Sequence, residues 1–183
     1  KFVNMVIKDC DSFYGGGMDC LNGSAAVLDN VVFSGNYSSH SSGALHLIGS
    51  AILRYVDFIN NESDTYGGAM EVGSDASPVL RHCSFTGKDG EWGGAVACNS
   101  NATPTLIDCL IKDNVSPRGA GLYTRVSSAP TLEGVTFCGN TATERGGAIY
   151  ATETSSPGLL EVTLANNAAP AGGGVIYVDA NAD

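Results

Sequence analysis

One short pattern recurs seven times along the chain, and its spacing constrains the fold more than any other sequence feature. The pattern is a pair of small residues, mostly glycine, followed by Ala or Gly and then by an apolar residue. Successive copies begin 27, 25, 26, 26, 27 and 26 residues apart. So constant a period is typical of proteins built from stacked repeats, in which each repeat contacts only its neighbours. The seven copies are Gly15–Met18, Ser42–Leu45, Gly67–Met70, Gly93–Val96, Gly119–Leu122, Gly146–Ile149 and Gly172–Val175.

A second pattern keeps the same period and places a large apolar residue three positions before an asparagine. In one copy Lys88 replaces the asparagine after Phe85. Stacked side-chain amides can hydrogen-bond along a ladder, and asparagine tolerates left-handed backbone conformation. We therefore expect these asparagines to form a structural ladder at left-handed corners. The ladder residues are Asn36, Asn61, Asn114, Asn140 and Asn167.

These repeats predict an all-β fold. The apolar runs are short, rich in β-branched and aromatic residues, and punctuated by Gly, Pro, Asn and Ser, with no sustained helical period. The Leu-x-x-Leu-x-Leu pattern of leucine-rich repeats is absent. We expect a right-handed parallel β-helix, a solenoid of about seven rungs of ~26 residues stacked about 4.8 Å apart. Residues 1–183 would form one such domain, an internal segment of a longer protein.

Alternation along the strand after each glycine pair predicts which side chains face the core. A strand has a side-chain period of two, so Leu45 and Leu47 are expected inside. The intervening residues are expected outside. They are His46, Glu71, Ala97 and Tyr150.

The two patterns together resemble the repeats of chlamydial polymorphic outer-membrane proteins. The closest matches to Gly-Gly-Ala-apolar are Gly67–Met70, Gly93–Val96 and Gly146–Ile149, and they combine with the Phe-x-x-Asn segments that begin at Phe33 and Phe58. Similar repeats occur in large surface proteins of other bacteria, algae and protists. The resemblance covers essentially the whole chain. It implies a pectin-lyase-like β-helix outside the cell, used as an adhesin or stalk and carrying no catalytic site.

Charge excludes several classes of partner. Nine Lys and Arg stand against 19 Asp and Glu, for a net charge of −10. Nucleic-acid binding depends on basic residues that neutralise phosphates, so we expect no nucleic-acid partner. No run of 18 apolar residues occurs, so no membrane insertion is expected. We expect an extracellular or cell-surface location.

The six cysteines leave two main interpretations open. No Cys-x-x-Cys occurs, which gives a zinc or redox site little support. Cys83 and Cys109 share an inward column on adjacent rungs, close enough for a disulfide. The alternative is that Cys83, Cys98 and Cys109 are simply small core residues.

An enzymatic site finds little support in the sequence. The closest polar cluster is Arg54, Arg81, His82 and Asp108, which has one carboxylate where glycoside hydrolysis needs two. The calcium-binding nonapeptide of β-helices is absent, and no column is a run of aspartates. We therefore expect no catalytic residues, no metal and no cofactor.

One column suggests a binding edge. The residues before four successive glycine pairs are Tyr66, Trp92, Arg118 and Arg145, which stacking would place side by side. Aromatic rings and arginines in a row can bind sugar rings or a protein. They can equally form a cation–π ladder that only stabilises the corner.

Five sequons for N-glycosylation occur, and three of them coincide with ladder asparagines. Those three amides would be occupied by the ladder. Asn22 and Asn101 lie in loop-like sequence and are the better acceptors.

The most economical function is structural. We expect a non-catalytic stalk, filament or adhesin scaffold whose ends, or one face, are covered by other protein subunits or domains, because an open strand edge invites pairing. The alternatives are a glycan-binding module and a β-helix that cleaves polysaccharides as a lyase or hydrolase.

Overall fold

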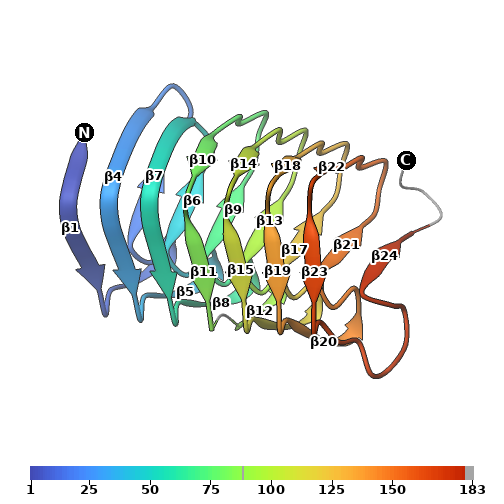
Figure 1. The fold of residues 1–183 in the computed structure, drawn as a ribbon. Helices are drawn as coiled ribbons and strands as arrows, with labels where there is room; N and C mark the ends of the chain where they lie inside the picture. The colour runs from blue at the N-terminus through green and yellow to red at the C-terminus, as the bar shows by residue number, and fades with distance from the viewer. Residues whose placement is uncertain (88, 180–183) are drawn as a thin grey trace.

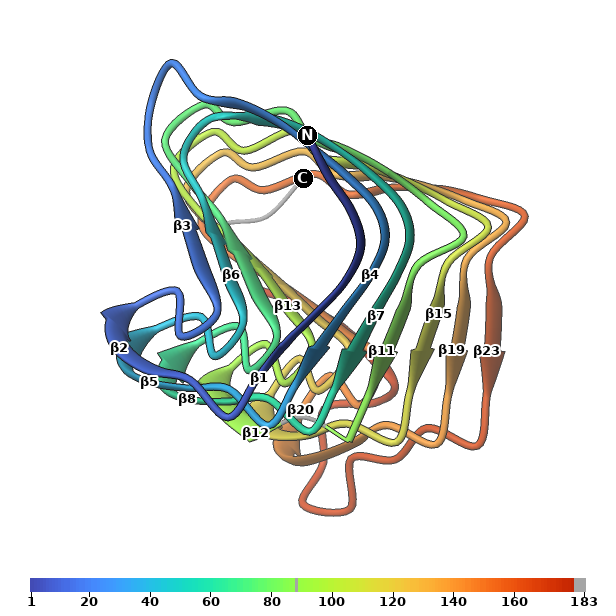
Figure 2. The ribbon, with the colours of Figure 1, turned by 90° about the vertical axis from the view of Figure 1, so that its left-hand side faces the viewer.

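The structure is a computed structural model that describes residues 1–87 and 89–179, and every regular element in these residues is a β-strand. The chain passes through three sheets in turn, and all strand pairs are parallel (Figure 1). Seen along the axis, the rungs lie one above another (Figure 2). The prediction of an all-β parallel β-helix with about seven rungs of ~26 residues is confirmed. No helix capable of spanning a membrane occurs within the described ranges.

The largest sheet has eleven strands among the described residues. Each rung bends in it at one residue of left-handed conformation, such as Tyr55 in the third rung and His82 in the fourth. In the first three rungs a single long strand runs through the bend, and in later rungs the bend separates two short strands. The strands are β1 (Phe2–Lys8), β4 (Ala25–Ser34), β7 (Ser50–Ile59), β10 (Val79–Arg81), β11 (Ser84–Thr86), β14 (Thr105–Ile107), β15 (Leu110–Lys112), β18 (Thr131–Glu133), β19 (Thr136–Cys138), β22 (Gly158–Leu160) and β23 (Thr163–Ala165).

The other two sheets have six and seven strands in the described part of the chain. The six-stranded sheet contains β2 (Asp11–Tyr14), β5 (Tyr37–Ser41), β8 (Glu62–Tyr66), β12 (Asp89–Trp92), β16 (Val115–Arg118) and β20 (Thr141–Arg145). The seven-stranded sheet contains β3 (Met18–Cys20), β6 (Leu45–Leu47), β9 (Met70–Val72), β13 (Val96–Cys98), β17 (Leu122–Thr124), β21 (Ile149–Ala151) and β24 (Ile176–Val178).

In the core, residues of the same type stack on one another from rung to rung. Pairing joins equivalent positions of successive rungs, for example Leu53 with Leu80. The rings of Phe33, Phe58 and Phe85 lie parallel within 5°, with centroids 5.2 and 4.7 Å apart. All three rings are fully buried. The inward positions predicted from alternation, including Leu45 and Leu47, are likewise buried.

The glycine pair serves two different purposes. Its first residue has a positive φ, for example +58° at Gly67 and +75° at Gly93. Ser42 adopts the same conformation and is held there because its hydroxyl donates to the carbonyl of Leu45 at 2.7 Å. Where the second residue is a glycine it leaves space instead, since a Cβ on Gly68 would lie 2.4 Å from the carbonyl oxygen of Gly94, whereas the fifth copy holds Ala120 at this position.

The asparagines form a ladder in two series on the inner side of the next corner. Asn36 donates its side-chain amide to Asn61 Oδ1 at 2.9 Å, and its main-chain N–H reaches the same oxygen at 3.0 Å. Asn114 to Asn140 and Asn140 to Asn167 repeat the side-chain contact at 2.8 Å. The position between these two series, Lys88, lies outside the described residues.

The expectation that the ladder asparagines have left-handed backbone conformation is wrong. The left-handed residue is the one before each asparagine, which turns the chain so that the amide points into the core. These preceding residues are Gly35, Asn60, Asp113, Gly139 and Asn166.

Candidate functional site

The six-stranded sheet passes into the seven-stranded sheet at the glycine pairs, and side chains on the outer side of this corner gather into one strip. We call this strip the outer corner. It consists of two columns, the residue before each glycine pair and the middle residue of each strand in the seven-stranded sheet. The first column is Tyr14, Ser41, Tyr66, Trp92, Arg118 and Arg145, and the second is Asp19, His46, Glu71, Ala97, Tyr123, Tyr150 and Tyr177.

The second column lies outside the main core, as alternation predicted, but most of its members are buried. Glu71 is only 8% exposed, Tyr150 5% and Ala97 0%. These side chains do point away from the core, but Tyr66 and Trp92 pack against the column and cover it. The corner thus holds a second buried cluster outside the main core, formed by side chains from two sheets.

The predicted binding column is assembled as the sequence indicated. Trp92 pairs with Tyr66 on one side and with Arg118 on the other, and Arg118 pairs with Arg145. The rings are engaged within the protein, however. The guanidinium of Arg118 lies 4.3 Å from the Trp92 ring centroid, and the Tyr123 ring lies 5.1 Å from it. A ring flanked in this way stabilises the corner and has little free face for a ligand.

The later rungs of the outer corner form a ladder of aromatic rings and cations. Tyr123, Tyr150 and Tyr177 stack with centroids 5.6 and 5.1 Å apart. Arg145 lies over the Tyr177 ring at 4.9 Å and donates to its hydroxyl at 2.9 Å. Arg118 also donates to Glu144 at 2.6 Å. Burial raises the pKa of Tyr123 to about 12.

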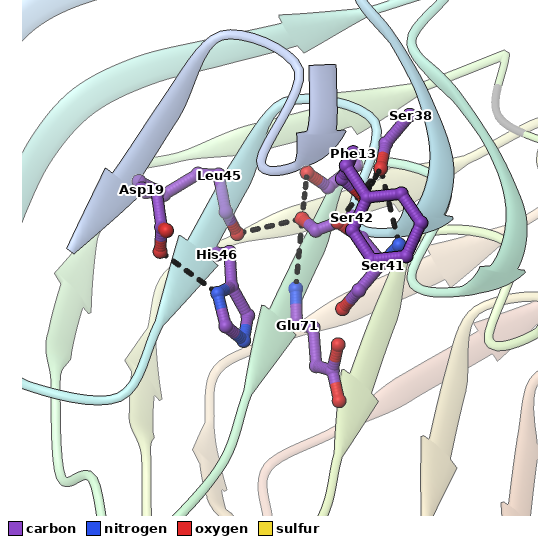
Figure 3. Close-up of polar contacts among 9 residues, drawn as sticks. Phe13, Asp19, Ser38, Ser41, Ser42, Leu45, His46 and Glu71 are labelled. Atoms are coloured by element: carbon purple, nitrogen blue, oxygen red, sulfur yellow. Dashed lines mark hydrogen bonds and ion pairs between the residues drawn. The ribbon is translucent and has the colours of Figure 1, made fainter. Parts of the chain in front are cut away.

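The side chains of the outer corner are polar in the earlier rungs. The sequence motifs did not predict this polar half as a site. Asp19 Oδ1 lies 2.8 Å from His46 Nδ1, which fixes Nδ1 as the nitrogen that carries a proton (Figure 3). The ring of Tyr14 stacks on the imidazole at 5.6 Å. His46 and Glu71 occupy paired positions on β6 and β9. The sequence does contain an indication of this polar half, because three ionisable residues occupy the same column position on successive rungs.

Glu71 continues this polar half into the next rungs. Its Oε1 accepts a hydrogen bond of 2.6 Å from Asn99, whose own oxygen accepts one of 2.9 Å from Arg125. The Arg125 guanidinium then lies over the Tyr66 ring at 5.0 Å. Burial raises the pKa of the Glu71 carboxyl, although the Asn99 hydrogen bond and the nearby cations act in the opposite direction.

The polar cluster considered from the sequence lies elsewhere, on the eleven-stranded sheet. Arg54 and Arg81 occupy paired positions, and His82 lies 3.9 Å from Asp108. All four side chains are exposed or half-buried. One carboxylate beside three basic groups does not form the pair of acids that glycoside hydrolysis uses. No group of three or more metal-ligating side chains was found in the residues that the structure describes.

All six cysteines lie in the described part of the chain, and all are free thiols. The structure therefore lacks the suggested bridge between Cys83 and Cys109. Each of these thiols donates to a main-chain carbonyl two residues earlier, Arg81 or Ile107, at 3.4 Å. Both are buried, and the contact with Cys109 together with burial raises the pKa of the Cys83 thiol.

The five sequons differ in accessibility. Asn36, Asn61 and Asn114 are at most 1% exposed, because their amides form the ladder. Asn22 and Asn101 are exposed in turns, and the Asn101 amide donates to Asp75 at 3.0 Å. Glycosylation at Asn22 and Asn101 stays a prediction that this geometry permits.

Comparison with known proteins adds one finding about the whole chain. A family model described as "Right handed beta helix region" matches residues 16–183. Searches of curated proteins and of solved structures each found no match.

Proposed function

Because the chain belongs to the family of right-handed β-helix regions, we propose that it is a stiff, non-catalytic segment of a large extracellular or cell-surface protein. Members of this architecture resist bending because each rung is hydrogen-bonded to its neighbours through three sheets. The finer assignment, to surface repeats like those of chlamydial polymorphic outer-membrane proteins, is part of the same proposal and rests on the repeat motifs.

One observation carries this proposal: the side chains that form repeated columns contact side chains of the next rung. Asparagine amides bind asparagine amides, and phenylalanine rings stack on phenylalanine rings. At the outer corner, Trp92 and Arg118 contact each other. Side chains that satisfy one another along the axis stabilise a rod and leave few groups for a substrate.

The two rims of the solenoid support a role for neighbouring protein. Strand β1 at one rim and strands β22 to β24 at the other pair on one side only among the described residues. Large apolar side chains are exposed there, including Val6 at 63% and Leu160 and Val178 at 57% each. Unpaired edges with apolar residues favour pairing, so we propose that other domains or subunits cover them.

The location and role can be tested together in cells of the source organism. A short epitope inserted at the exposed turn of Asn101 should be accessible to antibody on intact cells, whereas a cytoplasmic marker should not. Deleting whole rungs should shorten the surface structure seen by electron microscopy without abolishing its assembly. An epitope reached only after cell lysis would contradict the proposal.

Glycan binding and polysaccharide cleavage are the competing functions. Purified protein should not release reducing ends from polysaccharides. Replacing Trp92 by alanine should leave the affinity of the protein for every glycan unchanged. Cleavage, or a glycan affinity that depends on Trp92, would replace the structural role with one of these two.

A further inference from the structure

Two of the five arginines lack a partner in the solenoid, although the other three are firmly engaged. Each of the three has its guanidinium over an aromatic ring and a hydrogen bond to a side chain; they are Arg118, Arg125 and Arg145. Arg54 and Arg81 differ, because in the residues that the structure describes neither guanidinium forms an ion pair, a hydrogen bond or a ring contact. Both side chains are exposed, so they are free to bind a group from outside the chain.

The two free arginines lie side by side on the eleven-stranded sheet. Arg54 on β7 and Arg81 on β10 occupy paired positions, and adjacent strands lie about 4.8 Å apart. Asp29 has the paired position on β4, yet no ion pair within the described ranges joins it to Arg54, and Ile107 follows Arg81 on the other side. Like charges directly opposite each other destabilise a sheet. An anionic group held between the two guanidiniums would remove this repulsion.

An apolar hollow adjoins the arginine pair on the same strands, which lie next to one another in Figure 1. The hollow has a volume of about 190 Å³ and is lined by Val27, Ile52 and Val79 together with small residues around them. On β7 and on β10 the apolar residue comes two positions before the arginine, so both side chains lie on the same outer face. Along the strands the two positions are about 7 Å apart.

A pair of stacked rings borders the arginines at the bend of the sheet. Tyr55 and His82 directly follow the two arginines, and their ring centroids lie 5.2 Å apart. Tyr55 is 56% exposed. Exposed Tyr and Arg beside an apolar hollow match the composition of protein-binding surfaces, in which aromatic residues and arginine are enriched. A sugar chain fits less well, because an apolar hollow offers its hydroxyl groups no hydrogen-bond partners.

We propose that this surface, which we call the arginine face and which consists of Ile52, Arg54, Tyr55, Val79 and Arg81, docks an extended acidic segment of a partner protein. One carboxylate of the segment lies between the two guanidiniums and accepts hydrogen bonds from both. An apolar side chain two positions away along the segment fills the hollow, because an extended segment has the same spacing as the strands beneath it. The arginine face lies on the side of the solenoid, so this docking does not depend on the rims or on the proposed structural function.

NMR titration of the nitrogen-15-labelled chain with a blocked synthetic peptide, Thr-Leu-Thr-Glu-Thr, tests this docking. The peptide should shift the Nε–H resonances of Arg54 and Arg81 together with the main-chain N–H resonances of Ile52 and Val79. The shifts should follow one saturable curve with a dissociation constant below about 1 mM. A peptide with Gln in place of Glu should bind about tenfold more weakly, because it lacks the charge-assisted hydrogen bonds. Equal affinity of the two peptides, or no saturable shift at these residues, would overturn the proposal.

Two variants of the chain separate local recognition from net charge. Arg81→Gln should weaken binding of the Glu peptide about tenfold. Lys112→Gln is the matched control, because it removes the same charge from an exposed residue of the same sheet, whose Nζ lies 3.3 Å from Asp113. It should leave the affinity unchanged, and an equal loss in both variants would show only nonspecific attraction. Oligogalacturonate that shifts the same arginine resonances at lower concentration than the peptide would contradict a peptide site and indicate an acidic saccharide instead.

Discussion

At the scale of single residues, the glycine pairs show how one motif can answer two separate steric demands. The first glycine supplies a left-handed conformation, which other L-residues adopt at a cost. Ser42 meets this demand because its side chain hydrogen-bonds back to the main chain. The second glycine allows two main chains to approach, as Gly68 does next to Gly94, although the fifth copy accommodates Ala120 at the equivalent position.

Replacing Gly68 by alanine should therefore be severe. The new Cβ would lie 2.4 Å from the carbonyl oxygen of Gly94 and 2.5 Å from that of Asp89, so the rungs must separate locally. We expect a loss of about 3 kcal/mol in the free energy of unfolding, measured by denaturant titration. Gly158→Ala is the control, because its Cβ would meet only one atom, at 3.9 Å. Equal stability of the two variants would contradict this explanation of the pair.

At the scale of elements, the asparagine ladder connects the main chains of successive rungs. Asn61 accepts from the main-chain N–H of Asn36 and donates to the carbonyl of Phe33 at 3.1 Å. Both contacts are buried, so each one removed leaves a polar group that water does not reach.

The substitution Asn61→Ala should cost about 2–4 kcal/mol of unfolding free energy, because it removes partners from several buried groups at once. Asn22→Ala is the matched control, since Asn22 lies in an exposed turn. Its cost should stay within about 0.5 kcal/mol. Chemical denaturation followed by circular dichroism would measure both. A ladder variant as stable as the turn variant would show that the ladder is dispensable.

The aromatic ladder of the outer corner should respond to alkaline pH. Burial raises the pKa of Tyr123 to about 12, so the folded state keeps this phenol protonated where the unfolded chain begins to ionise. Stability should therefore fall as pH rises from about 10 to about 12. Ultraviolet titration of the phenolates should show a late phase that Tyr123→Phe diminishes, because the pKa values of Tyr37 and Tyr150 are raised as well. Uniform ionisation near pH 10 would contradict the buried stack.

At the scale of the whole molecule, the sequence predicted what depends on spacing and missed what depends on contacts between different columns. The period alone determines rung length, the inward columns and the stacking of Phe33 on Phe58, because in-register neighbours carry the same residue type. Alternation also assigned the direction of Glu71 correctly. Its burial could not be predicted, because it depends on Tyr66 and Arg125 from other elements. The prediction also placed the left-handed residue at each ladder asparagine, whereas the structure has it one residue earlier. That preceding residue makes the turn that directs the asparagine side chain inward.

The binding column was ambiguous in the sequence for a related reason. The sequence placed Trp92 next to Arg118 and left both a ligand-binding edge and a cation–π ladder open, and in the structure the guanidinium lies over the ring. Two residues that can each recognise a ligand can also satisfy each other. Only the distance between them distinguishes the two cases.

High-resolution electron cryomicroscopy of the native assembly, purified from the source cells, tests the central claim most directly. If the chain is a structural segment, protein density should continue from both rims of the solenoid, and the outer corner around Trp92 should carry no ligand. A free chain with bare rims and saccharide density on Trp92 would contradict the account, and it would identify the protein as a glycan-binding module.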